Sequence, residues 1–77
     1  MLKVTIMSNT TRDSEVVDPN NSTPRELLEQ FDIDYNSCTV HLDGIPLGIG
    51  MMDQTFTDLG VSGDKTYLSA VVKQDNK

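Results

Sequence analysis

The stretch STPRELLEQF, residues 22–31, carries the start signal of a helix and the apolar face that such a helix would bury. Thr23 can accept a hydrogen bond from the first helical turn, and Glu26 stands three positions later, which completes a capping box. Pro24 falls at the first helical position. An N–H there would have no acceptor within the helix, so the lack of one in proline costs nothing. The apolar residues that follow at helical spacing are Leu27, Leu28 and Phe31. The sequence therefore predicts one short helix that begins at Pro24 and ends between residues 31 and 33.

The residues before this helix show the pattern of a β-hairpin. Apolar and polar residues alternate through 1–8, which is the period of a strand with one buried face. Turn-forming residues follow at 9–13, and residues 14–18 have the pattern of a second short strand. Pro19 ends this strand, because proline has no N–H to donate and the asparagines after it favour turns.

A second hairpin is predicted over residues 38–47. Asp43 and Gly44 form a dipeptide that favours the tight turn of a hairpin. Pro46 limits the returning segment to a short edge strand, since proline cannot donate to a central ladder of hydrogen bonds.

The last strand is predicted over residues 65–73, where apolar and polar residues alternate again. Residues 48–64 are expected to form a loop with a single helical turn around Thr55–Leu59. The order is then strand, strand, helix, strand, short edge strand, strand, and the helical crossover permits parallel pairing. These elements predict a single α+β domain over residues 1–73, with a mixed four- to five-stranded sheet packed on one helix. A short polar tail follows at 74–77.

Alternation also assigns the two faces of the predicted sheet. The residues expected to face the helix are Leu2, Val4, Ile6, Val40, Leu42, Leu68, Ala70 and Val72. The residues expected on the opposite, uncovered face include Met7, His41, Tyr67 and Val71. Tyrosine and methionine are favoured at protein interfaces, so these four residues form a candidate protein-binding surface. The alternative is that they are scattered exposed side chains, which are normal on any protein.

The charge balance restricts the partners that the chain can bind. Twelve acidic and six basic residues give a net charge of −6, and the basic residues are scattered singly along the sequence. Binding to nucleic acid or to a membrane surface normally needs a basic patch, so neither is expected. A protein partner with a basic groove is expected instead, because opposite potentials speed encounter. The partner's identity is unknown, and the chain is expected to be a monomer or a weak dimer.

The single cysteine, Cys38, excludes an internal disulfide and a Cys-rich zinc site. No histidine or helix N-terminus is expected beside it to activate the thiol, so it is interpreted as a small buried apolar residue. The sequence shows no signal peptide and no apolar run of membrane length. The cytoplasm is the expected compartment.

No set of residues in the sequence has the spacing of a catalytic or metal-binding site. His41 is the only histidine and has no cluster of ligand residues around it, so it is expected to point outward from the sheet. The glycines at 48–50 lack the Lys-Ser/Thr pair of a phosphate-binding loop and are interpreted as loop residues. We therefore expect no metal, no cofactor and no enzymatic activity.

The order of elements, together with the segment DLGVSGDKTYL, resembles ubiquitin-like β-grasp proteins. Leu59, Gly60 and Val61 fill the positions that precede the last strand in such proteins, with residues 62–64 as the turn. HLDGIPL is similar to their passage into the edge strand. In particular the chain resembles small prokaryotic ubiquitin-like proteins of bacterial mobile elements, which are related in fold to the sulfur carriers of thiamine and molybdopterin synthesis. The resemblance implies that the uncovered sheet face binds a partner.

Sulfur carriers and conjugated modifiers of this family end in Gly-Gly, because an activating enzyme needs a terminus without side chains. The sequence KQDNK at residues 73–77 contains no glycine. The expected function is therefore a non-catalytic ubiquitin-like protein-interaction module. The alternative is a degenerate or unprocessed sulfur carrier or protein modifier that lacks Gly-Gly.

Overall fold

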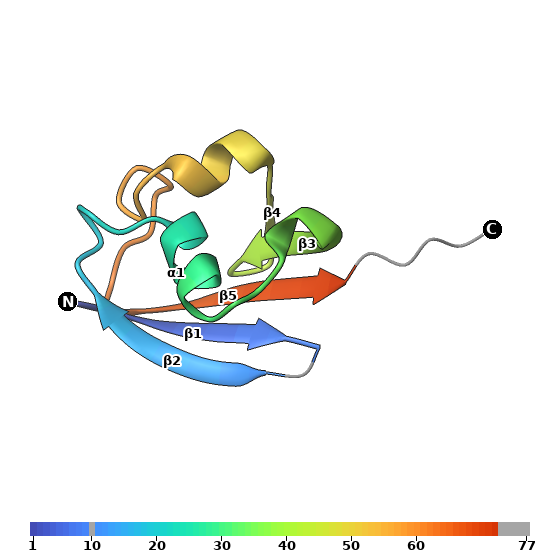
Figure 1. Cartoon of the computed structure of the whole chain (residues 1–77). Helices are drawn as coiled ribbons and strands as arrows, with labels where there is room; N and C mark the ends of the chain where they lie inside the picture. The colour runs from blue at the N-terminus through green and yellow to red at the C-terminus, as the bar shows by residue number, and fades with distance from the viewer. Residues whose placement is uncertain (10, 73–77) are drawn as a thin grey trace.

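The computed structural model describes residues 1–9 and 11–72 and contains one mixed sheet with a helix packed on it (Figure 1). The strands are β1 Leu2–Ser8, β2 Arg12–Val17, β3 Cys38–Leu42, β4 Ile45–Leu47 and β5 Lys65–Val72. The helical segments are α1 Pro24–Gln30 and the 3-10 turns η1 Tyr35–Ser37 and η2 Ile49–Asp53. The predicted α+β class is confirmed. Residue 73 and the predicted tail, 74–77, lie outside the described residues.

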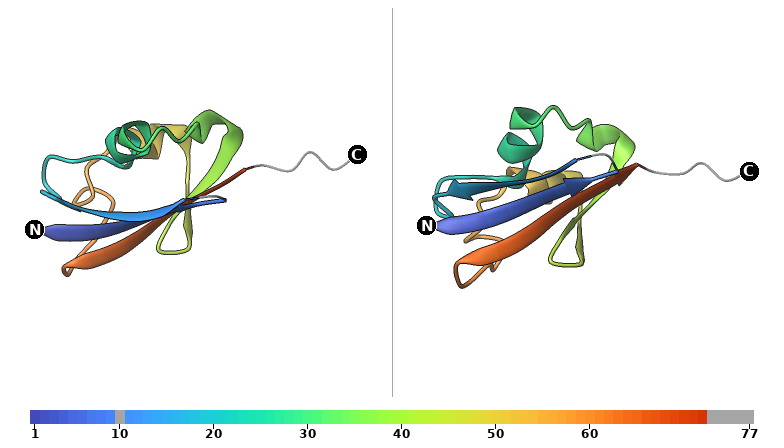
Figure 2. Two further views of the ribbon diagram at one scale, coloured as in Figure 1. Left: turned by 60° about the horizontal axis from the view of Figure 1, so that its bottom comes forward. Right: turned by 90° about the horizontal axis from the view of Figure 1, so that it is seen from below.

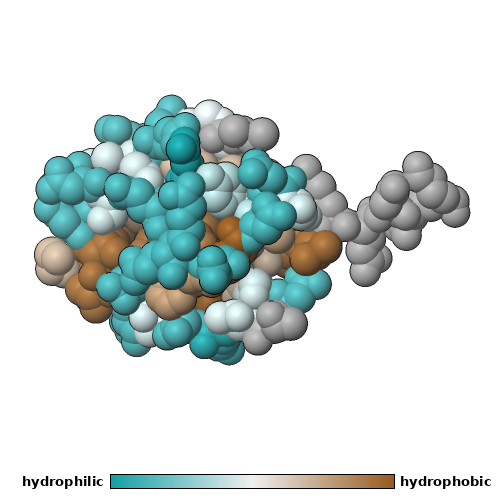
Figure 3. All heavy atoms as spheres, in the orientation of Figure 1, coloured by the Kyte–Doolittle hydropathy of each residue, from teal (hydrophilic) through white to brown (hydrophobic). Residues whose placement is uncertain are grey.

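The strands lie in the order β2-β1-β5-β3-β4. β1 and β5 pair in parallel, whereas the other neighbouring strands pair antiparallel. Both views of Figure 2 show α1 on one side of the sheet, and no described helix covers the middle of the other side. In the space-filling view, hydrophobic residues reach the surface mainly in a band between the helical half and the sheet (Figure 3). The core therefore lies on one face of the sheet, and the opposite face of β1 and β5 is open.

The predicted capping box at the start of α1 is confirmed. Glu26 donates its backbone N–H to Thr23 Oγ1 at 3.3 Å, and the Thr23 N–H donates to Glu26 Oε1 at 3.1 Å. At the other end Asp32 adopts a left-handed φ of 62°. The Ile33 N–H then donates to the Leu28 carbonyl at 2.9 Å, which is the hydrogen bond of a Schellman motif. Hydrogen bonds from neighbouring residues in the sequence therefore cap both ends of this seven-residue helix.

Replacing Thr23 with alanine is expected to lower the free energy of unfolding by about 1 kcal/mol, because a first-turn N–H loses its acceptor. Thr23→Ser keeps a hydroxyl at the cap and is the matched control, with a loss of at most a few tenths of a kcal/mol. Urea unfolding of both variants measures the difference. Equal losses in the two variants would show that the cap hydrogen bond does not stabilise the helix.

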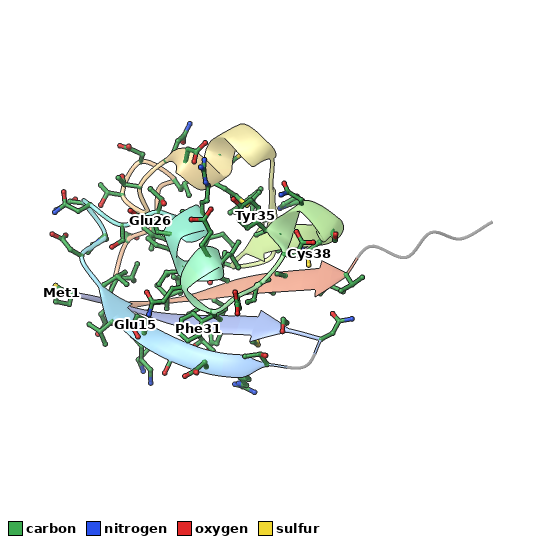
Figure 4. All side chains as sticks on the ribbon, in the orientation of Figure 1. Met1, Glu15, Glu26, Phe31, Tyr35 and Cys38 are labelled. Carbon is green, nitrogen blue, oxygen red and sulfur yellow. The ribbon has the colours of Figure 1, made fainter. Side chains whose placement is uncertain are left out.

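The predicted inward face of the sheet is confirmed at seven of its eight positions. The buried residues among them are Leu2, Val4, Ile6, Val40, Leu42, Leu68 and Ala70. The expectation that Cys38 is buried is confirmed as well. From α1, Leu27 and Leu28 are buried in the same cluster, and Phe31 packs against it from the end of the helix (Figure 4).

The expectation that Val72 packs under the helix is wrong, because 48% of its surface is exposed. β1 ends at Ser8, which pairs with Ala70, so Val72 extends beyond the last residue of β1. A seven-residue helix is about 10 Å long, whereas an eight-residue strand is about 26 Å long. α1 therefore cannot cover the whole length of β5.

Residues 48–64, which were predicted as a loop, contribute side chains to the core. The predicted helical turn is present, since the Leu59 N–H donates to the Thr55 carbonyl at 3.0 Å. The 3-10 turn η2 was not predicted, and it includes residues 49 and 50, which were interpreted as loop. Met52 and Phe56 are buried, and Phe56 has no exposed surface. These two side chains belong to the same buried cluster as the inward residues of the sheet.

Candidate protein-binding face

The register of the sheet brings the four predicted surface residues together around Ser69. Met7 pairs with Ser69 across β1 and β5, and His41 pairs with Ser69 across β3 and β5. Tyr67 and Val71 lie two positions before and after Ser69 on β5. Neighbouring strands are about 4.8 Å apart and alternate residues about 6.6 Å apart, so the four side chains surround Ser69 on one face. We call the uncovered side of the sheet the outer face.

These residues differ in their exposure to solvent. Tyr67 and Val71 are each 50% exposed, whereas Met7 and His41 are half-buried. The position of His41 on the outer face confirms that it points away from the core. Sequence reasoning missed Ser69 at the centre, because a small polar residue in a strand has no interface signal of its own. Only the pairing of Ser69 with both neighbouring strands reveals its place.

The Asp43-Gly44 turn holds Tyr67 in position from the side. Both turn residues have positive φ, 51° and 84°, as a two-residue type I′ hairpin requires. The Asp43 carboxylate accepts hydrogen bonds from the buried Thr66 hydroxyl at 2.6 Å and from the Tyr67 N–H at 3.0 Å. The Asp43 N–H donates in turn to the Tyr67 carbonyl at 2.8 Å. The backbone that carries Tyr67 is therefore tied to the β3–β4 hairpin.

Basic residues also gather on the outer face. Lys3 pairs with Lys65 across β1 and β5, and Arg12 pairs with Met7 across β2 and β1. Alternation then places the three cations on the same side as Tyr67 and Val71, and all three are exposed. Lys3 and Lys65, which are far apart in the sequence, are therefore neighbours in the sheet. Arg12 lies on β2 opposite Met7, four positions farther along β1 than Lys3.

Two solved structures have a chain path similar to this one. A ubiquitin-like protein from Trypanosoma brucei superimposes with a TM-score of 0.69 and 25% identity, over 95% of each chain. A ubiquitin-like protein from the hyperthermophilic archaeon Caldiarchaeum subterraneum gives a TM-score of 0.57 and 16% identity, over 97% of this chain and all of the other. The chain has a ubiquitin-like β-grasp fold. No protein-family model and no curated protein sequence matches it.

Within the part of the chain that the structure describes, no three His, Cys, Asp or Glu side chains are grouped to hold a metal ion. No helix formed by residues 1–9 and 11–72 is long and apolar enough to cross a membrane.

A polar network on the helical side of the ubiquitin-like domain joins α1 to the two 3-10 turns. The Arg25 guanidinium pairs with Asp53 of η2 and with Glu29, and the Tyr35 hydroxyl donates to Glu29 at 2.8 Å. The hydrogen bond to Asp53 raises the pKa of Arg25, and the hydrogen bond to Glu29 raises the pKa of Tyr35. The charged groups are exposed, Tyr35 is half-buried, and all of them are satisfied by one another, so they have a structural role on the side away from the outer face.

Proposed function

We propose that this ubiquitin-like domain is a non-catalytic protein-interaction module that binds its partner through the outer face. The observation that carries the proposal is the convergence of Met7, His41, Tyr67 and Val71 around Ser69 on a side of the sheet that no described helix covers. Half-exposed tyrosine and aliphatic side chains on a rigid sheet supply contact area with little loss of side-chain freedom on binding. The ubiquitin-like fold of the two similar structures supports a role in protein interaction or modification.

The finer parts of the proposal come from the sequence. The resemblance to small prokaryotic proteins of mobile elements, the relation to sulfur carriers and the cytoplasmic location stay predictions. The preference for a monomer or a weak dimer stays a prediction too. None of them is needed for the outer face to act as a binding surface.

The double variant Tyr67→Ala, Val71→Ser is expected to reduce partner capture from cell lysate at least tenfold while hardly changing the melting temperature. Both side chains point away from the core, so they contribute to contacts with a partner more than to folding. Ile45→Ser with Met51→Ala is the matched control, because these residues are exposed and apolar but lie at the β4 edge and in η2. Quantitative mass spectrometry of the captured proteins measures the change. Equal capture by the outer-face variant and the wild type would refute the proposal.

The alternative function is that of a sulfur carrier or protein modifier. It would act through residues 73–77, which lie outside the described residues, and it is compatible with the same fold. Mass spectrometry of the protein recovered from its native cells separates the two functions. A branched peptide that joins the C-terminus to a lysine, or a C-terminal thiocarboxylate, would establish the alternative.

A further inference from the structure

The sheet separates the cations of the outer face from most of the carboxylates. Lys3, Arg12 and Lys65 occupy outward positions of three neighbouring strands, and no outward position of a described strand holds an aspartate or a glutamate. The two acidic residues of β2, Asp13 and Glu15, pair with Ile6 and Val4 of the buried face. The other described carboxylates lie in α1, η2, turns and loops. A chain with a net charge of −6 thus presents a locally cationic face.

The pairing of Lys3 with Lys65 places two like charges on neighbouring strands. Like charges directly opposite each other in a sheet destabilise it. In the part of the chain that the structure describes, the ion pairs are those of Arg25 with Glu29 and Asp53, so neither lysine forms an ion pair. An external anion beside Lys3 and Lys65 would relieve this repulsion.

A shallow groove of about 390 Å³ lies between β1 and β2 beside this pair. Lys3, Thr5, Arg12, Asp13 and Ser14 line it, so cations stand at its two ends and hydroxyls between them. The carboxylate of Asp13 accepts a hydrogen bond from the Ser14 N–H at 2.8 Å, so one of its oxygens already has a partner within β2. The groove offers two charged donors and two hydroxyls to an incoming carboxylate.

We propose that the outer face recognises an acidic protein segment, in which carboxylates alternate with apolar side chains. The proposal rests on the proposed function and names the chemistry of the partner. The carboxylates bind Lys3, Lys65 and Arg12, and the apolar side chains pack on Met7, Tyr67 and Val71. Charges farther than about 8 Å are screened at physiological salt, so the cations on this face act more strongly on a bound segment than the carboxylates of α1 and η2 on the helical side. The proposal thus names an acidic partner, whereas the net charge of the whole chain predicts a partner with a basic groove.

A protein segment fits this face better than a nucleic acid does. Three cations can neutralise few phosphates, and the eleven carboxylates of the described residues repel the rest of a polyanion. The apolar half of the face needs a partner with aliphatic or aromatic side chains, which a phosphate backbone does not supply.

The test is a titration of the full-length, ¹⁵N-labelled chain, followed by amide chemical shifts. The probe is a peptide as long as β5 that alternates glutamate and valine, and its matched control has lysine in place of glutamate. We expect the glutamate peptide to shift the amides of β1, β2 and β5 and to bind this face at least roughly tenfold more tightly than the lysine peptide. Its binding should weaken as salt is raised. Equal binding of the lysine peptide at this face, or shifts from the glutamate peptide confined to the helical side, would refute the proposal.

Charge reversal at position 65 gives a second readout. Lys65→Glu should weaken binding of the glutamate peptide roughly tenfold and raise the urea midpoint, because the new carboxylate pairs with Lys3. Arg25→Glu changes the net charge by the same amount on the helical side and should leave binding within about twofold. A Lys65→Glu variant that binds the peptide as well as the wild type would overturn the assignment.

The experiments also separate this proposal from the proposed function. If Tyr67→Ala with Val71→Ser loses its cellular partners while Lys65→Glu keeps them, the outer face binds proteins but not through acidic segments. An oligo-thymidylate that binds the outer face more tightly than the glutamate peptide would assign the face to nucleic acid and overturn both proposals.

Discussion

Replacing Phe56 with alanine should lower the free energy of unfolding by about 3–5 kcal/mol, which is the largest loss we expect from one substitution in this domain. Phe56 has no exposed surface, although it lies outside every helix and strand. Its N–H donates to the Ser22 carbonyl at 3.2 Å, and its carbonyl accepts the Val61 N–H at 3.0 Å, so the backbone around it is held at two points. Removal of the ring would leave a cavity that this anchored segment cannot readily close.

Urea unfolding followed by circular dichroism measures the loss. Domains of this size have total stabilities of roughly 5–15 kcal/mol or less, so the variant should be partly unfolded at room temperature or close to it. Phe31→Ala is the matched control, because Phe31 only packs against the edge of the core and should give a clearly smaller loss. Losses of equal size would mean that Phe56 is not a central element of the core.

Leu68→Ala is expected to cost roughly 2–4 kcal/mol of unfolding free energy. Leu68 has no exposed surface and pairs with Ile6 on one side and Leu42 on the other, so the substitution would empty the middle of the buried face. Val71→Ala, three residues later on the outer face, is the control and should change stability by less than about 1 kcal/mol. A Leu68→Ala variant with the urea midpoint of the wild type would show that the alternation of β5 had been assigned to the wrong face.

Several features of this fold could be predicted from short stretches of sequence. The capping box at Thr23 and Glu26 is formed by residues three positions apart, so its signal is complete within one helical turn. The Asp43-Gly44 turn is likewise local, because both residues must adopt positive φ whatever surrounds them. The alternation in β1, β3 and β5 assigned the buried face, since a strand has a period of two residues in any sheet.

The same local patterns did not predict where a strand extends beyond the helix that covers it. Val72 continues the alternation of β5, but its burial depends on the lengths of β1 and α1, which are set elsewhere in the chain. Phe56 and Met52 lie in the segment 48–64 that was predicted as a loop, and their burial shows only in the folded chain. Both side chains join the cluster formed by the inward residues of the sheet and of α1.

The arrangement of residues on the outer face was decided by the tertiary structure. Sequence alternation placed Met7, His41, Tyr67 and Val71 on one side of the sheet, but it contained no distances between them. The parallel register of β1 with β5 and the antiparallel register of β3 with β5 bring them to Ser69. The same registers gather cations that are separated by up to sixty-two positions, from Lys3 to Lys65. Caps, turns and periods are short-range properties that a sequence by itself determines, whereas the pairing of distant strands, and with it the charge of this face, exists only once the sheet has formed.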